Sequence, residues 1–154
     1  MDVVWDTPEL TLAEREGLCV MVMRRKPDDE NFARCVAHVR AVASRQQVFS
    51  TLMVFPDFDG RPTASRASQH ALVETLGALA SQNCGTALVV TTPGRWGSIV
   101  RAFVNTVVLL ARPKKPLQTH LTLASALKWL RTLPGQLPAI RDAHGLEGEL
   151  QPLL

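Results

Sequence analysis

The residues of this chain best able to bind a metal or move a proton are its four histidines, His38, His70, His120 and His144. They stand on four different predicted segments, and no two have the close spacing of a known zinc-ligand pair. We therefore expect no metal site. The spacing also predicts that His38 is a solvated residue of a helix.

A second candidate for chemistry is the acidic pair Asp57 and Asp59, which follows a predicted buried strand. Carboxylates in that position can hold magnesium or serve phosphoryl transfer. A turn that leads into a helix also needs such residues for backbone capping alone. The capping interpretation is the one we favour.

The turn Thr91–Ser98 contains two glycines and Arg95 ahead of a predicted helix. Helix amino termini attract anions. However, the spacing matches neither the Walker pattern nor the three-glycine dinucleotide fingerprint. Ser98 follows Gly97, but Val100 stands where a nucleophile elbow needs its second glycine. No acid, base and nucleophile can be assembled, so we expect a protein that is not an enzyme and needs no cofactor.

A nearly all-apolar helix is predicted over 99–111, with a compact polar sector made only by Arg101 and Asn105. A surface helix against one sheet needs an apolar stripe of roughly 100° or somewhat more, and this one is far wider. Two interpretations stay open: the helix is buried on two sides, or part of it faces a partner.

Just before this helix, Trp96 lies next to Arg95, and both residue types are common among interface hot spots. The alternative is that Trp96 folds back onto the sheet edge and the last helix covers the remaining face. The predicted contact surface consists of Arg95, Trp96, Arg101, Val104 and Val108.

Hydrophobic periodicity predicts strands alternating with helices along most of the chain. Such alternation calls for parallel pairing through right-handed crossovers. We expect an α/β fold with a single mixed, mainly parallel sheet of four or five strands and about four helices. The strands are expected near 3–5, 18–23, 48–55, 86–91 and 117–121, and the helices near 28–43, 63–82, 99–111 and 123–133.

The sequence also predicts turns, helix caps and a domain boundary in the segments that connect these elements. Residues 7–17 are predicted to turn between the first two strands, with an antiparallel edge if the amino-terminal segment pairs as a hairpin. Thr63 is expected to cap the second helix and Asn83–Gly85 to close it, while Thr122 is expected to cap the last helix. The domain is expected to span 1–133, followed by a tail at 134–154 that either packs locally or binds something.

Composition sets the protein class. The chain has 154 residues, of which 46% are hydrophobic and 20% charged, as expected for one globular domain. Its formal net charge of +3 is too mild to indicate nucleic-acid binding. The run 102–111 is too short to cross a bilayer. Three cysteines and no secretory signal predict reduced thiols in the cytoplasm.

The order of elements and two short motifs resemble the SpoIIAA-like branch of the STAS proteins, also called STAS/SEC14-like. The motifs are the strand Thr86-Ala87-Leu88-Val89-Val90 and the closing helix Ala126-Leu127-Lys128-Trp129-Leu130. The resemblance covers about Leu18 to Leu133. It implies a fold shared with regulatory proteins that are generally not enzymes. Some of these are switched by phosphorylation of an Asp-Ser serine, a dipeptide that this chain lacks.

The sequence therefore predicts a non-enzymatic cytoplasmic module of bacterial signalling type that acts by regulation or scaffolding. Its partner would be another protein or a second copy of the chain, with no nucleic acid and no stable membrane insertion. The alternative is a domain that binds a small apolar ligand or lipid between the apolar helix and the sheet.

Overall fold

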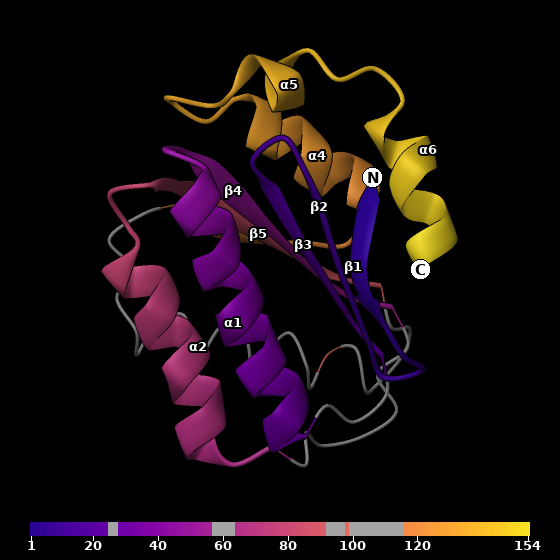
Figure 1. The fold of residues 1–154 in the computed structure, drawn as a ribbon. Helices are drawn as coiled ribbons and strands as arrows, with labels where there is room; N and C mark the ends of the chain where they lie inside the picture. The colour runs from indigo at the N-terminus through magenta and orange to yellow at the C-terminus, as the bar shows by residue number, and fades with distance from the viewer. Residues whose placement is uncertain (25–27, 57–63, 92–97, 99–115) are drawn as a thin grey trace.

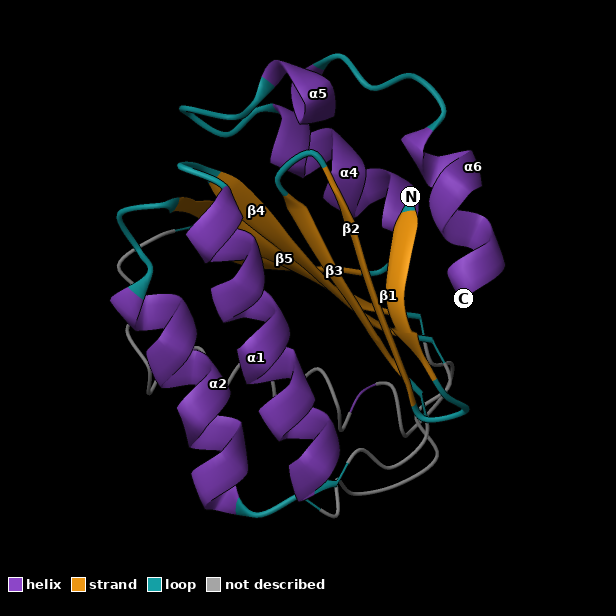
Figure 2. Ribbon diagram, viewed as in Figure 1, coloured by secondary structure: helices purple, strands orange, loops and turns teal. Residues whose placement is uncertain are grey.

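The computed structural model describes residues 1–24, 28–56, 64–91, 98 and 116–154 (Figure 1). Within these ranges a mixed sheet has helices on both faces (Figure 2). The predicted class, a single mixed and mainly parallel α/β sheet, is confirmed. The described residues contain six strands rather than four or five: β1 (Asp2–Asp6), β2 (Leu10–Arg15), β3 (Leu18–Met23), β4 (Phe49–Phe55), β5 (Asn83–Val90) and β6 (Leu117–His120).

The strands lie in sequence order, β1-β2-β3-β4-β5-β6. The first three pair antiparallel, and β3, β4, β5 and β6 pair parallel through crossovers. The conditional expectation of an antiparallel edge at the amino terminus is thus confirmed. The carboxyl ends of the parallel strands meet at one edge of the sheet, where Val22, Val54, Val89 and His120 stand in register.

β2 was the missed strand, because residues 7–17 were expected to form a turn. Leu10 and Leu12 pack into the core on one face of the sheet, while Ala13 packs into the core on the other. This is the period-two pattern of a strand. The true turn is the tight pair Glu16 and Gly17, at φ +41° and +85°. Positive φ at both positions is typical of a hairpin turn that matches strand twist.

One face of the sheet is covered by α1 (Asp29–Arg45) and α2 (Arg66–Ala78). Asp28 caps α1, because its side chain accepts from the Asn31 amide. The cap of α2 is Ser65, whose hydroxyl accepts from the Ser68 amide, so the prediction of Thr63 as the cap is wrong. The cap lies two residues later than expected, and the Ser65 hydroxyl satisfies one of the free amides of the first turn, that of Ser68.

The opposite face is covered by α4 (Leu123–Arg131), which Thr122 caps as predicted. The segment after residue 133 packs on the same face. It forms α5 (Pro138–Arg141), α6 (Leu146–Leu150) and η1 (Gln151–Leu153). Its apolar side chains Ile140, Leu146 and Leu150 are buried with residues of β3, β4 and β5.

Buried Gln136 fixes the start of this carboxyl-terminal segment. Its side-chain amide donates to the Ser50 hydroxyl (3.0 Å) and to the Leu130 carbonyl (2.8 Å). Its side-chain oxygen accepts from the Leu137 amide (3.1 Å). A buried amide whose donors and acceptor are all used orients the chain strongly, because any other arrangement leaves a polar group unpaired.

β5 begins at Asn83, so the expectation that Asn83–Gly85 closes the preceding helix is wrong. The Asn83 side chain donates to the Thr86 hydroxyl and accepts from the Gly85 amide, within the strand. Gly85 is needed for a close approach. A Cβ there would lie 2.6 Å from Leu133 Cδ1 and 3.0 Å from the Pro116 carbonyl oxygen.

The cysteines Cys19, Cys35 and Cys84 are free and buried, as the sequence predicted. Burial in the apolar layer raises the pKa of the Cys35 thiol to about 12 and raises the pKa of Cys19 further. A thiol that stays protonated at neutral pH is a poor nucleophile. In the described part of the chain, no helix combines the length and the apolar character that a membrane crossing requires.

Candidate functional site

The predicted contact residues Arg95, Trp96, Arg101, Val104 and Val108 lie outside the described residues, as does the acidic pair Asp57 and Asp59. Their roles stay predictions. Ser98 is described, and it has helical backbone and an exposed side chain.

The four histidines are held on separate elements. His70 lies on α2, with Nδ1 3.5 Å from Glu74, while His144 is exposed between α5 and α6. Across the described ranges, no three residues of the types His, Cys, Asp and Glu come together as metal ligands.

His38 is not the solvated helix residue that its position predicted. It is only 4% exposed, and its Nε2 lies 3.1 Å from the Ala13 carbonyl oxygen of β2. Because this oxygen can only accept, the ring nitrogen donates. Burial lowers the pKa of His38. Its ring therefore links α1 to β2 in the neutral form.

His120 ends β6 at the edge where the parallel strands terminate. The imidazole is buried against Trp129 of α4, with ring centroids 5.5 Å apart. No hydrogen-bond partner of its buried Nε2 is found in the described part of the chain. Desolvation lowers the pKa of His120. The ring thus packs against Trp129 as a neutral, flat group.

A small hollow lies where the hairpin turn of β2 and β3 meets the end of α1. It measures about 20 Å³, which is room for a single water, and is lined by Glu14, Glu16, Gly17, Val42, Arg45 and Gln46. An ion pair between Arg45 and Glu14 crosses its rim. A lipid or a metabolite cannot enter a space of this size.

The feature with the clearest functional meaning is the free margin of β1. Among the described strands, β1 is hydrogen-bonded to β2 alone, so one row of its backbone groups has no partner strand in the described part of the sheet (Figure 2). Its side chains include Val3 and Val4, which are 50% and 56% exposed and rank among the most exposed large apolar residues described. We call Asp2–Asp6, with this free margin, the β1 edge.

The β1 edge is held in place from the side of α1. Trp5 turns toward that helix, and the guanidinium of Arg34 stacks on its ring at 3.7 Å from the centroid. Glu30, one turn earlier on α1, forms an ion pair with Arg34, with 2.6 Å between Glu30 Oε1 and Arg34 Nη2. A register shift between Val3 and Trp5 marks a bulge, which re-aims side chains locally.

Each end of the β1 edge carries an exposed carboxylate. Asp6 accepts from the Thr11 hydroxyl, and its Oδ1 lies 3.8 Å from Nη1 of Arg24. Asp2 stands opposite Glu14 of β2, and no side-chain partner of Asp2 is found in the described part of the chain. Along the β1 edge, an exposed aspartate is therefore followed by two exposed valines, by the tryptophan that stacks with Arg34, and by a second exposed aspartate.

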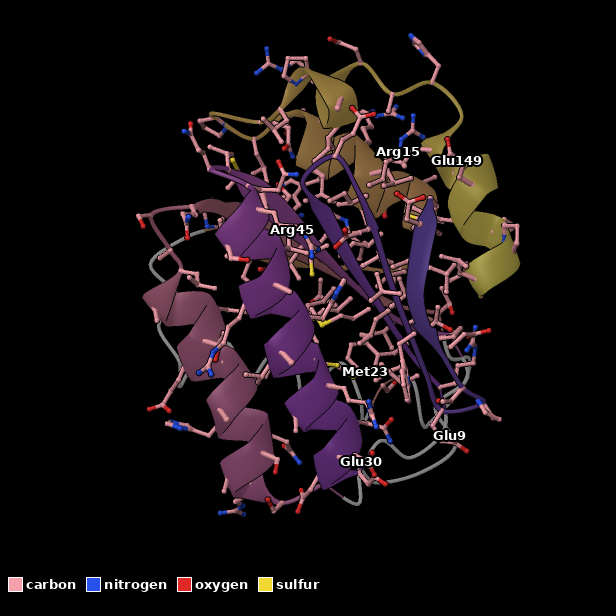
Figure 3. The ribbon with its side chains drawn as sticks, viewed as in Figure 1. Glu9, Arg15, Met23, Glu30, Arg45 and Glu149 are labelled. Atoms are coloured by element: carbon pink, nitrogen blue, oxygen red, sulfur yellow. The ribbon has the colours of Figure 1, made fainter. Side chains whose placement is uncertain are left out.

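The amino-terminal end of β1 is close to α6. Figure 3 shows Arg15 of β2 and Glu149 of α6 pointing toward each other, and the two form an ion pair. Glu149 also lies 3.0 Å from the Met1 amine. These contacts lower the pKa of the Glu149 carboxyl, with the bond to the amine as the largest cause. They anchor α6 beside the strand and leave Val3 and Val4 uncovered.

Sequence reasoning predicted a strand at 3–5 and gave it no role. The signal that could have identified it is the pattern Asp-Val-Val-Trp-Asp at residues 2–6. A short β-branched run bounded by charges is how natural sheets protect an exposed edge strand.

Comparison of the sequence with models of known protein families gave no match, and comparison with curated proteins gave none either. Comparison with solved structures did find likenesses. One is a protein from Shewanella loihica PV-4, described as an uncharacterized member of the DUF3478 family with a SpoIIAA-like fold. The match has a TM-score of 0.56 and 10% sequence identity, and covers 81% of this chain and 96% of the other. The predicted resemblance to the SpoIIAA-like fold is therefore confirmed at the level of the fold.

Proposed function

We propose that this protein is a regulatory or scaffolding module that acts by binding another polypeptide and catalyses no reaction itself. The observation that carries the proposal is the β1 edge. It offers an unpaired row of backbone groups beside exposed valines, on a strand braced from behind by Arg34. An extended segment can add to such an edge by main-chain hydrogen bonds.

The chemistry of the described interior supports the same proposal. Burial lowers the pKa of His38 and His120, burial raises the pKa of the Cys19 and Cys35 thiols, and the hollow beside the hairpin turn has room for a single water. None of these groups is placed to activate a substrate. Regulatory roles are common among proteins that resemble the STAS family, which adds weight without naming a partner.

Predicted residues Trp96, Val104 and Val108 remain a second candidate surface. On that prediction, Val104→Glu or Val108→Glu changes the association state and preserves the fold. The alternative of an apolar ligand rests on the same segment and gains no support from the described hollow. Cytoplasmic location is part of the proposal, because the three cysteines stay unpaired.

The test is affinity purification of the full chain from cells that express it, after mild cross-linking, with mass spectrometry of what is retained. The matched variant is Val4→Lys, which places a charge on the β1 edge. A partner retained by the wild type and lost by Val4→Lys supports the proposal. A chain that sediments as a monomer and retains no polypeptide overturns it.

A further inference from the structure

We propose that α6 and η1 form a strap along the hairpin of β2 and β3, and that the strap detaches as a unit and so enlarges the apolar surface beside the β1 edge. The strap is residues 146–153. The inference rests on the proposed function and adds its regulation. Two observations carry it: the side chains that the strap covers, and the arginines that hold it at the two ends of the hairpin.

One face of the hairpin lies in the same apolar cluster as the strap. Successive side chains of a strand point to opposite faces, and Ala13 of β2 shares its face with Val20 and Val22 of β3. Leu146 and Leu150 of the strap are buried with these three residues. The three residues of the hairpin are 0% exposed. The strap is therefore part of the cover that keeps water from this face.

An arginine at each end of the hairpin holds the strap. Arg15 ends β2 at the hairpin turn and forms an ion pair with Glu149 of α6 (Figure 3). Arg24 follows β3 at the other end, where its amide donates to the Glu9 carbonyl ahead of β2. The Arg24 guanidinium donates to the Leu153 carbonyl of η1. Because the two arginines stand at opposite ends of the hairpin, these contacts lay the strap along its length.

The strap depends on these contacts for its order. α6 has five residues and η1 has three, and helices this short are not stable on their own. Gly145, at the start of α6, has φ +90° and no side chain that could cap the helix. Gln136 and Ile140 hold the preceding part of the segment separately. A short unit with its own contacts opens at a lower free energy than the whole domain.

The position of Val3 connects the strap to the β1 edge. Val3 stands opposite Ala13 in the sheet, and Ala13 stands opposite Val20, so the three share one face. With the strap in place, the apolar part of the β1 edge is Val3 and Val4. A standard protein interface takes about 800 Å² from each partner, far more than two valines supply. Detachment joins the hairpin face to the edge and makes one continuous apolar surface.

The strap therefore inhibits any partner that needs this larger surface. Such a partner binds the detached state, so its apparent affinity is proportional to the fraction of molecules in that state. While the attached state dominates, a substitution that raises the detached fraction raises the affinity by the same factor. This equality separates a regulating strap from a segment that only adds stability.

The first measurement is hydrogen exchange of the full chain. We expect the amides of 147–154 to exchange faster than those of β4, and Arg15→Gln to speed their exchange about threefold, because a partly exposed ion pair is lost. Leu150→Ala should speed it at least about tenfold. The matched control is Arg45→Gln, which removes an ion pair with Glu14 and changes the charge equally. The control should leave 147–154 unchanged.

The second measurement reports exposure of the hairpin face. In Ala13→Cys the new thiol lies on the face that the strap helps to cover, and dithionitrobenzoate labels it when the strap detaches. The native thiols of Cys19, Cys35 and Cys84 are buried and provide the background rate. We expect Arg15→Gln to speed labelling of Ala13→Cys about threefold, matching hydrogen exchange, and Arg45→Gln to leave it unchanged.

The third measurement tests regulation. A polypeptide that the wild type retains and Val4→Lys loses should be retained about threefold more tightly by Arg15→Gln and equally by Arg45→Gln. If 147–154 exchange no faster than β4, the strap does not detach separately, and the inference fails while the proposed function stands. If Arg15→Gln speeds exchange and labelling but leaves retention unchanged, the strap does not regulate binding. If no variant retains a polypeptide, the proposed function fails, and the regulation fails with it.

Discussion

At the scale of the residue, His38 gives the protein a defined response to pH. Its pKa lies below the ordinary 6.5 because the ring is buried, whereas in the unfolded chain it titrates normally. As the pH falls below about 6.5, the unfolded state therefore binds more protons than the folded state, and the free energy of unfolding decreases. Stability is full above about pH 6.5 and declines below it.

The variant His38→Gln isolates this effect, because glutamine can donate to the Ala13 carbonyl and does not titrate. We expect urea midpoints that drop between about pH 7.5 and about pH 5.5 in the wild type and drop less in the variant. Some slope persists, since the pKa of His120 is lowered in the same direction. Equal slopes in both proteins would contradict the assignment to His38.

Arg34 is the second residue with a specific prediction. Its guanidinium stacks on Trp5 and is held by Glu30. We expect Arg34→Ala to lower the free energy of unfolding by about 0.5–1 kcal/mol through the lost cation–π contact. Glu30→Ala, which removes only an exposed ion pair, should cost less, about 0.3 kcal/mol. The check is urea denaturation; equal losses in the two variants would show that the stacking contributes nothing.

His38 also shows why single residues were the hardest to predict. Its neighbours on α1 follow helical periodicity, and periodicity alone put it outside the apolar face. The structure buries it because the Ala13 carbonyl accepts its ring N–H. Such a partner comes from another strand and is not visible in local sequence. Thr122 was predictable because a helix cap bonds within its own turn.

At the scale of the element, the carboxyl-terminal segment bears directly on the predicted domain limit of residue 133. Ile140, Leu146 and Leu150 are 2%, 1% and 1% exposed. Burying a side chain of this kind contributes about 1.5–3 kcal/mol, so the three together match the total stability of an ordinary domain. We expect a chain truncated after Leu133 to lose cooperative unfolding.

The measurement is circular dichroism during urea denaturation of residues 1–133 beside the full chain. The control is Leu146→Ala, which should remain folded and lose about 2–5 kcal/mol. A cooperative transition in the truncated chain would support residue 133 as the end of the domain.

The elements that periodicity predicted well are those whose pattern is long. α1 and β4 agree with their predicted ranges to within about two residues. β2 was missed because residues 7–17 combine a short alternating run with turn residues at both ends. α5 and α6 have four and five residues, too few to show a helical period.

At the scale of the whole molecule, the fold could be predicted and the candidate site could not. Alternating strands and helices constrain topology strongly, which is why the SpoIIAA-like arrangement was recognised from short motifs. The β1 edge becomes a candidate only when the strand order places β1 at the margin of the sheet. That order depends on β2, the strand that the sequence analysis assigned to a turn.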